Sequence, residues 1–195
     1  MGRSGWSLCR WVVAAATLTL LFSGSLRAQA VAVAPLSHGE ITFAMRATKV
    51  NDFVGRVTVL TAEYSGADLA AVHGVLELRV SDMHTGIGLR DTHMRNAMRA
   101  DSFPTVRFEL VGVDPSAARG DTVPVVFQGH LTIHGVTRTI RVPGTVVTRH
   151  GGVDVTAAIQ LDMREYGIVP PTRFLGAIRV APVTVVTATL RFGGN

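Results

Sequence analysis

The sequence contains only one cysteine and one lysine, and it has no run of basic residues. The cysteine, Cys9, lies within the first thirty residues, which we expect to be removed from the mature protein. Residues 31–195 therefore hold no thiol for a disulfide or a thiolate metal site. Three of the 19 basic residues and none of the 14 acidic residues precede residue 31, so the formal net charge from there on is +2. Because the arginines are scattered singly, this part of the chain is not expected to bind nucleic acid.

The first thirty residues have the features of a secretory signal peptide. Arg3 and Arg10 precede an apolar stretch at 11–22, which is too short to span a bilayer comfortably. Small residues at 28–30 then fit an A-x-A cleavage site. We expect cleavage after Ala30 and a periplasmic or secreted protein. An uncleaved membrane anchor is the alternative.

The rest of the chain is long enough for one domain with its own core, and its pattern is that of β-structure. We expect a flexible leader at 31–39 and a folded domain at 40–195. In the domain, apolar and polar residues alternate along successive segments, which is typical of antiparallel strands around one core. The eight predicted strands span residues 40–46, 53–60, 70–80, 105–113, 123–133, 138–149, 153–163 and 178–192.

One segment has a helical period. In residues 91–100, Met94 and Met98 are four apart, Asp91 is the expected N-cap, and Pro104 follows the end. Eight strands and one short helix between strands predict an all-β fold, an eight-stranded antiparallel barrel. Such a barrel is either filled by its own side chains or holds one small ligand.

Catalytic and metal-binding motifs are missing from the sequence. There is no G-x-S-x-G nucleophile, and Asp162 and Glu165 are a carboxylate pair only by proximity along the chain. His93 has no second histidine at ligand spacing, while His130 and His134 share one strand face without a further ligand. We therefore expect no enzyme activity, no catalytic residue, no metal and no cofactor.

Four motifs resemble the YceI-like family: T-G-x-x-x-R-D-x-H-M-R at 85–95, F-P-T-V-R-F at 103–108, G-H-L-T-I-H-G-V-T-R at 129–138 and M-R-E-Y-G-I at 163–168. The resemblance extends from about residue 38 to 192. The sequence departs from the family pattern near the start of this range, where the usual aspartate-proline-x-histidine-serine opening is missing. The resemblance implies an exported bacterial protein with a lipocalin-like barrel that binds a polyisoprenoid or similar long-chain lipid.

In a lipid-binding barrel the apolar strand faces line a cavity, whereas the same pattern without the resemblance indicates a packed core. Aliphatic, phenyl and small side chains on those faces are the expected lining. They are Phe43, Leu78, Phe108, Phe127, Leu131, Ile159, Ala188 and Leu190.

The resemblance places the 85–95 motif in the loop and short helix between two strands. Met94 and Met98 are expected at the entrance of the cavity, because methionine adapts to a flexible chain. Arg90, Asp91 and His93 are expected to be structural. Asp91 would cap the helix, Arg90 would bond carbonyls, and His93 would lie on another side of the helix from the two methionines.

Two functions remain open at this point. The preferred one is an exported protein that sequesters or carries a polyisoprenoid, an isoprenoid quinone or a similar long-chain lipid, without covalent chemistry. The alternative is a stress-related or structural protein-interaction module whose barrel is filled by its own side chains. A continuous interior cavity would favour the first. The sequence leaves open whether the protein forms a homodimer and whether it touches a membrane transiently during lipid loading.

Overall fold

The computed structural model describes residues 35–49, 51–66, 71–149, 151–173 and 177–193, and antiparallel strands make up most of this part of the chain. The described residues belong to the unit Val31–Asn195. The expected signal peptide and residues 31–34 lie outside them, so the cleavage site stays a prediction. In the described ranges no helix is long and apolar enough to cross a membrane.

All eight predicted strands are present, and two more are added. The strands are β1 (Leu36–Ala47), β2 (Phe53–Thr58), β3 (Thr61–Ser65), β4 (His73–Arg79), β5 (Thr105–Pro115), β6 (Thr122–Ile133), β7 (Val136–Arg149), β8 (Gly152–Asp162), β9 (Thr172–Arg173) and β10 (Ile178–Gly193). The helix α1 (Gly88–Ala97) lies between β4 and β5, and short 3-10 turns occupy η2 (Val80–Asp82) and η3 (Met163–Tyr166).

The sheet closes on itself at β2 and β3. Its order is β2-β1-β10-β8-β7-β6-β5-β4-β3, so its two ends are strands that follow one another in the chain. At the corner between them, the Val59 N–H donates to the Gly39 carbonyl of β1, and the Leu60 N–H donates to the Glu77 carbonyl of β4. β2 and β3 therefore act as one bent strand that removes both free edges. With β9 as a two-residue addition to β10, the fold is the predicted eight-stranded antiparallel barrel.

The start of β1 and the presence of β3 differ from the sequence prediction. β1 already begins at Leu36, so residues 36–39 belong to the barrel and not to a leader. The backbone pairs Gly39 with Leu190 of β10, which extends the strand toward its start. β3 was not predicted, because Tyr64 and Ser65 open a stretch of turn-forming residues. In the structure both pair with β4.

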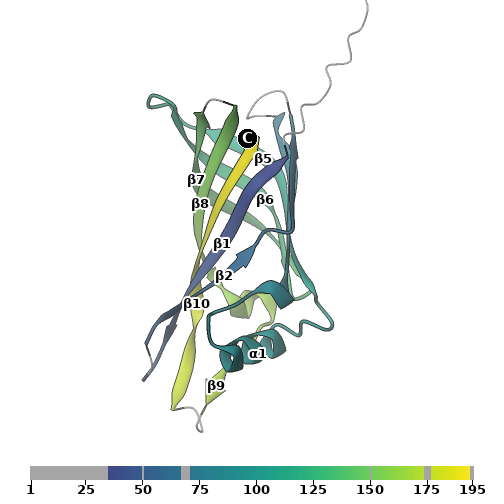
Figure 1. Cartoon of the computed structure of the whole chain (residues 1–195), viewed down its shortest axis with the longest axis vertical. Coiled ribbons are helices and arrows are strands. Elements are labelled where there is room, and N and C mark those ends of the chain that lie inside the picture. The colour runs from purple at the N-terminus through teal and green to yellow at the C-terminus, as the bar shows by residue number, and fades with distance from the viewer. Residues whose placement is uncertain (1–34, 50, 67–70, 150, 174–176, 194–195) are drawn as a thin grey trace, which may run out of the picture. The chain divides into compact units, whose positions relative to one another are not determined.

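The helix begins three residues earlier than predicted. α1 starts at Gly88 with Ile87 at the N-cap position and no side-chain cap, so the prediction that Asp91 caps the helix is wrong. Gly86, with φ of 80°, turns the chain into the helix in the left-handed region that glycine tolerates. α1 lies across the end of the barrel opposite the end where β10 finishes (Figure 1).

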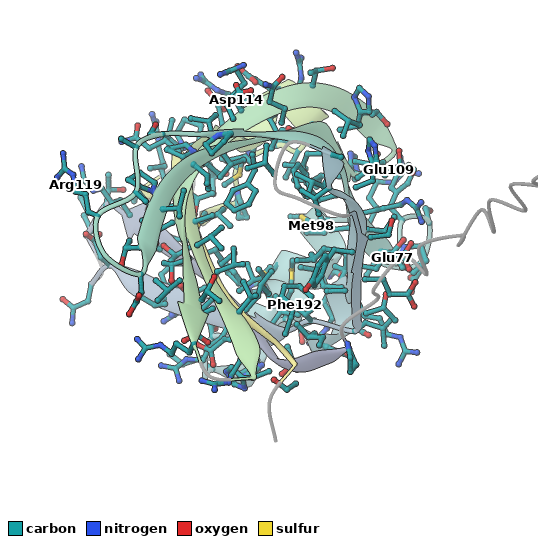
Figure 2. All side chains as sticks on the ribbon, turned by 90° about the horizontal axis from the view of Figure 1, so that it is seen from above. Glu77, Met98, Glu109, Asp114, Arg119 and Phe192 are labelled. Carbon is teal, nitrogen blue, oxygen red and sulfur yellow. The ribbon has the colours of Figure 1, made fainter. Side chains whose placement is uncertain are left out.

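Charged side chains of the barrel wall face outward. Arg107 of β5 pairs with Glu77 at 2.7 Å and with Glu109 at 2.6 Å, and Asp114 pairs with Arg141 at 2.8 Å. The view along the barrel shows Glu77, Glu109 and Asp114 outside the ribbon, whereas Met98 lies in the open centre (Figure 2). The period of two along each strand thus sends polar groups to the solvent and apolar groups to the interior.

Candidate functional site

A cavity of about 1130 Å³ occupies the interior of the barrel. Its wall is built from the inward faces of the strands and from one face of α1, and nearly all of the lining side chains are apolar. Ligand pockets in proteins usually measure about 300–1,000 Å³, so this space is at or above the upper end. The interior is not filled by the protein's own side chains, which argues against the self-filled alternative.

The eight residues predicted to line the barrel all lie on the cavity wall. They are Phe43, Leu78, Phe108, Phe127, Leu131, Ile159, Ala188 and Leu190. Phe43 is 9% exposed and Leu78 is 4% exposed. Ala188 pairs with Ala157 of β8, and both alanines line the cavity. Their small side chains leave more of the interior free on that side. That these residues contact a ligand stays a prediction.

Glycines in neighbouring strands make room for three phenylalanine rings at the cavity wall. A Cβ added at Gly55 would overlap the ring of Phe43, its cross-strand partner. The same holds for Gly129 and the ring of Phe108, and a Cβ at Gly144 would lie 2.8 Å from Phe127. A ring over a glycine packs directly against the sheet, because the glycine has no side chain between the ring and the backbone. Each ring therefore covers the wall and takes little of the interior.

The methionines of α1 face the cavity, and their expected place at its entrance stays a prediction. Met94 and Met98 both line it, together with Ala97 between them. Ile87 and Leu89, just before and in the first turn of the helix, also line it, although Ile87 is 50% and Leu89 is 69% exposed. These two apolar side chains therefore lie at the rim, between the interior and the solvent.

His93 and Arg90 also line the cavity, which differs from the sequence prediction. The inward stripe of α1 runs through Arg90, His93, Met94 and Ala97, which follows the helical repeat of three and four residues. His93 therefore lies on the same side as Met94 and not on another side. Among the described residues, the Arg90 guanidinium contacts no carbonyl; its carbon lies 4.0 Å from the ring centre of Phe53.

Asp91 ties the preceding loop to the helix. It is 8% exposed, and its Oδ1 accepts hydrogen bonds from the Thr85 N–H at 2.8 Å and from the Thr85 hydroxyl at 2.6 Å. Burial raises the pKa of Asp91, but the Thr85 hydrogen bonds and the positive charge of Arg95 outweigh it and hold the pKa below its ordinary value. Asp91 therefore anchors the loop at Thr85 to α1 and does not cap the start of the helix.

The histidines of the barrel have separate partners. His130 Nδ1 lies 3.2 Å from the Thr139 hydroxyl, whereas His134 Nδ1 donates to the Tyr166 carbonyl at 3.2 Å. The His134 ring also packs on Phe103, with 4.6 Å between the ring centres. Within the described ranges, no three His, Cys, Asp or Glu side chains gather in an arrangement that fits a metal ion.

The geometry defines a class of protein: an antiparallel barrel with a hollow apolar interior and one helix at its end. The YceI-like domain family matches residues 32–192, so the chain belongs to the YceI-like family. No curated protein matches the chain.

Solved structures share the fold at low sequence identity. BcnA of Burkholderia cenocepacia is 14% identical with a TM-score of 0.65, covering 78% of this chain and 95% of BcnA. A polyisoprenoid binding domain from Saccharophagus degradans, implicated in plant cell wall breakdown, is 13% identical with a TM-score of 0.64, covering 85% and 99%. The Campylobacter jejuni YceI protein is 11% identical with a TM-score of 0.58, covering 75% and 88%.

Proposed function

We propose that this protein is an exported carrier that holds a polyisoprenoid, an isoprenoid quinone or a similar long-chain lipid in the barrel and performs no covalent chemistry. The observation that carries the proposal is the cavity of about 1130 Å³ with its apolar wall. An apolar space of this size fits an extended hydrocarbon and gives a polar ligand few partners. Membership in the YceI-like family and the similarity to a polyisoprenoid binding domain support it.

The energetics of burial are sufficient for such a ligand. Each buried methylene contributes roughly 0.8 kcal/mol, so ten methylenes supply about 8 kcal/mol. The cost of fixing a ligand is of the same order, which leaves net affinity only for chains longer than this. A long-chain lipid is therefore the ligand class that the cavity favours over a short apolar molecule.

Loading is proposed to take place at the α1 end through a transient contact with a membrane. Ile87 and Leu89 are exposed apolar residues that also line the cavity, so a lipid chain passing over them stays in contact with apolar surface. Met94 and Met98 lie next along this path, where their flexible side chains would gate the entrance. In this proposal α1 controls uptake.

The test of the proposed function is direct. Mature protein purified from its native host is extracted with organic solvent, and the extract is analysed by mass spectrometry. We expect one long-chain lipid class at close to one molecule per protein. An extract without lipid, from protein that also fails to take up lipid from vesicles, would contradict the proposal.

A further inference from the structure

Three residues with charged or imidazole side chains lie along the described wall of the cavity: Arg90, His93 and Glu63. The first two belong to the same stripe of α1, three residues apart, so they face the interior side by side. Both are half-buried. The cavity therefore carries a cationic group and an imidazole together at the end that α1 covers.

The acidic group lies elsewhere. Glu63 is in β3 and pairs with Val75 of β4. Along β3, Ala62 is buried and Glu63 is exposed, so the Glu63 side chain is on the outward face, the face that also carries Glu77 of β4. Glu63 therefore does not place its carboxylate in the interior beside Arg90 and His93.

Within the described ranges, the Arg90 guanidinium has no acidic partner. Among the described residues, no carboxylate lies within 4.0 Å of it, whereas Arg107, Arg141 and Arg164 each pair with at least one. The carboxylate of the neighbouring Asp91 accepts two hydrogen bonds from Thr85 instead. The ring of Phe53 holds the Arg90 side chain but offers no oxygen to its five N–H donors.

The His93 ring, like the Arg90 guanidinium, is available to bind a ligand. In the described part of the chain its ring makes no hydrogen bond or ion pair, although it faces the cavity. By contrast, His84, His130 and His134 each bond a neighbouring oxygen. The described residues give neither group an acceptor. A guanidinium and an imidazole side by side on a mostly apolar wall match an oxyanion at the head of an amphiphile.

We propose that Arg90 and His93 form a headgroup subsite, which binds the carboxylate or phosphate of an acidic lipid while the tail runs along the barrel away from α1. This inference rests on the proposed lipid-carrier function and adds the charge and the orientation of the ligand. A lipid that enters tail first over Leu89 would end with its head at Arg90, which is consistent with loading at the same end.

The test is a competition assay with ligands that differ only in the headgroup. The neutral dye N-phenyl-1-naphthylamine occupies the delipidated cavity, and hexadecanoic acid, hexadecyl phosphate and hexadecanol displace it. We expect at least one of the two acidic ligands to bind about tenfold or more tightly than hexadecanol, the size of one charge-assisted hydrogen bond. A preference for the phosphate over the carboxylate, or the reverse, identifies the headgroup.

Variants assign the preference to the subsite. The preference is the ratio of the affinity for the acidic ligand to the affinity for hexadecanol. Arg90→Gln should reduce this ratio to near one, Arg90→Lys should keep most of it, and His93→Gln should lower it in part. Arg99→Gln is the matched control, because Arg99 is on the exposed side after the same helix and lies 5.4 Å from the ring centre of Phe103. Thermal unfolding of each variant verifies that the barrel is intact. If Arg90→Gln does not fold, His93→Gln replaces it as the variant that tests the subsite.

The outcomes separate this inference from the proposed function. Hexadecanol binding as tightly as both acidic ligands would overturn the subsite and leave the lipid carrier standing. A preference that survives in both Arg90→Gln and His93→Gln would also overturn it. Failure of the dye and of all three ligands to bind would contradict the carrier function itself.

Discussion

The ring of Phe43 on β1 lies over Gly55, the residue paired with it on β2. The three atoms nearest to an added Cβ at Gly55 all belong to that ring. The glycine therefore sets where the ring lies, and the ring in turn covers backbone that would otherwise face the cavity.

This pair gives a prediction for Gly55→Ala. The added methyl group displaces the Phe43 ring toward the interior, so we expect a loss of about 1–3 kcal/mol in the free energy of unfolding, typical of overpacking. Phe43→Leu should relieve most of that cost in the double variant, since the two positions share the strain. Urea unfolding of the four proteins in the cycle measures the coupling. Additive effects of the two changes would contradict the contact.

A second prediction concerns Asp91 and pH. The pKa of its carboxyl is held below the ordinary value of 3.8 in the folded protein. Its ionised form thus stabilises the fold above that pH, and the contribution is lost as the pH falls through the folded-state pKa. We expect Asp91→Asn to be less stable than wild type at pH 7 by about 1–3 kcal/mol, with the gap narrowing toward pH 3. Asp101→Asn, which changes an exposed acid in the turn after α1, is the control. A gap that stays constant with pH would rule out this account.

The strands and their inward faces were predictable from the sequence, because the alternation of apolar and polar residues indicates both a strand and the side of it that faces the interior. Phe108 and Phe127 reach the cavity for that reason alone. The pairing of Phe43 with Gly55 was not predictable, because it depends on the register between two strands. β3 was hidden because its five residues merge into a turn-forming stretch.

The orientation of Arg90 and His93 could not be read from the sequence for a different reason. The prediction set the helix start at Asp91 and assigned the faces from there. The backbone begins α1 at Gly88, and Asp91 is held by Thr85 in the loop. How far a short helix is rotated depends on such loop contacts, which leave little periodic signal. The inward stripe could be assigned only from the structure.

Membrane contact at the α1 end is tested at Leu89. This side chain is 69% exposed, and fully burying a leucine contributes about 1.5–3 kcal/mol. Leu89→Glu should therefore weaken association with phosphatidylglycerol-containing vesicles about tenfold or more, as measured by flotation. Val111→Glu on β5 changes an exposed valine of the barrel wall, 45% exposed, and should have little effect. Equal losses in both variants would argue against a specific contact at α1.

Export is tested by the N-terminus of the protein recovered outside the cytoplasm. The apolar stretch at 11–22 and the small residues at 28–30 predict a mature protein that begins at Val31. Edman sequencing or intact-mass measurement reads this position. A stable, membrane-bound form that keeps the first thirty residues would show that the segment is an anchor.

The proposed function requires a lipid inside the barrel, and the variant Ala188→Phe probes whether one is there. Ala188 lines the cavity beside Ala157, so a phenyl ring there fills space that a lipid tail would use. Ala158→Phe is the matched control, because Ala158 is exposed and adjacent to the inward-facing Ala157 on β8. The measurement is the lipid recovered per protein by solvent extraction and mass spectrometry, with thermal unfolding alongside. We expect Ala188→Phe to lose its lipid while its unfolding temperature holds or rises, and Ala158→Phe to keep the lipid. Unchanged lipid in Ala188→Phe, or a loss of about 1–3 kcal/mol in stability with no lipid in either protein, would contradict it.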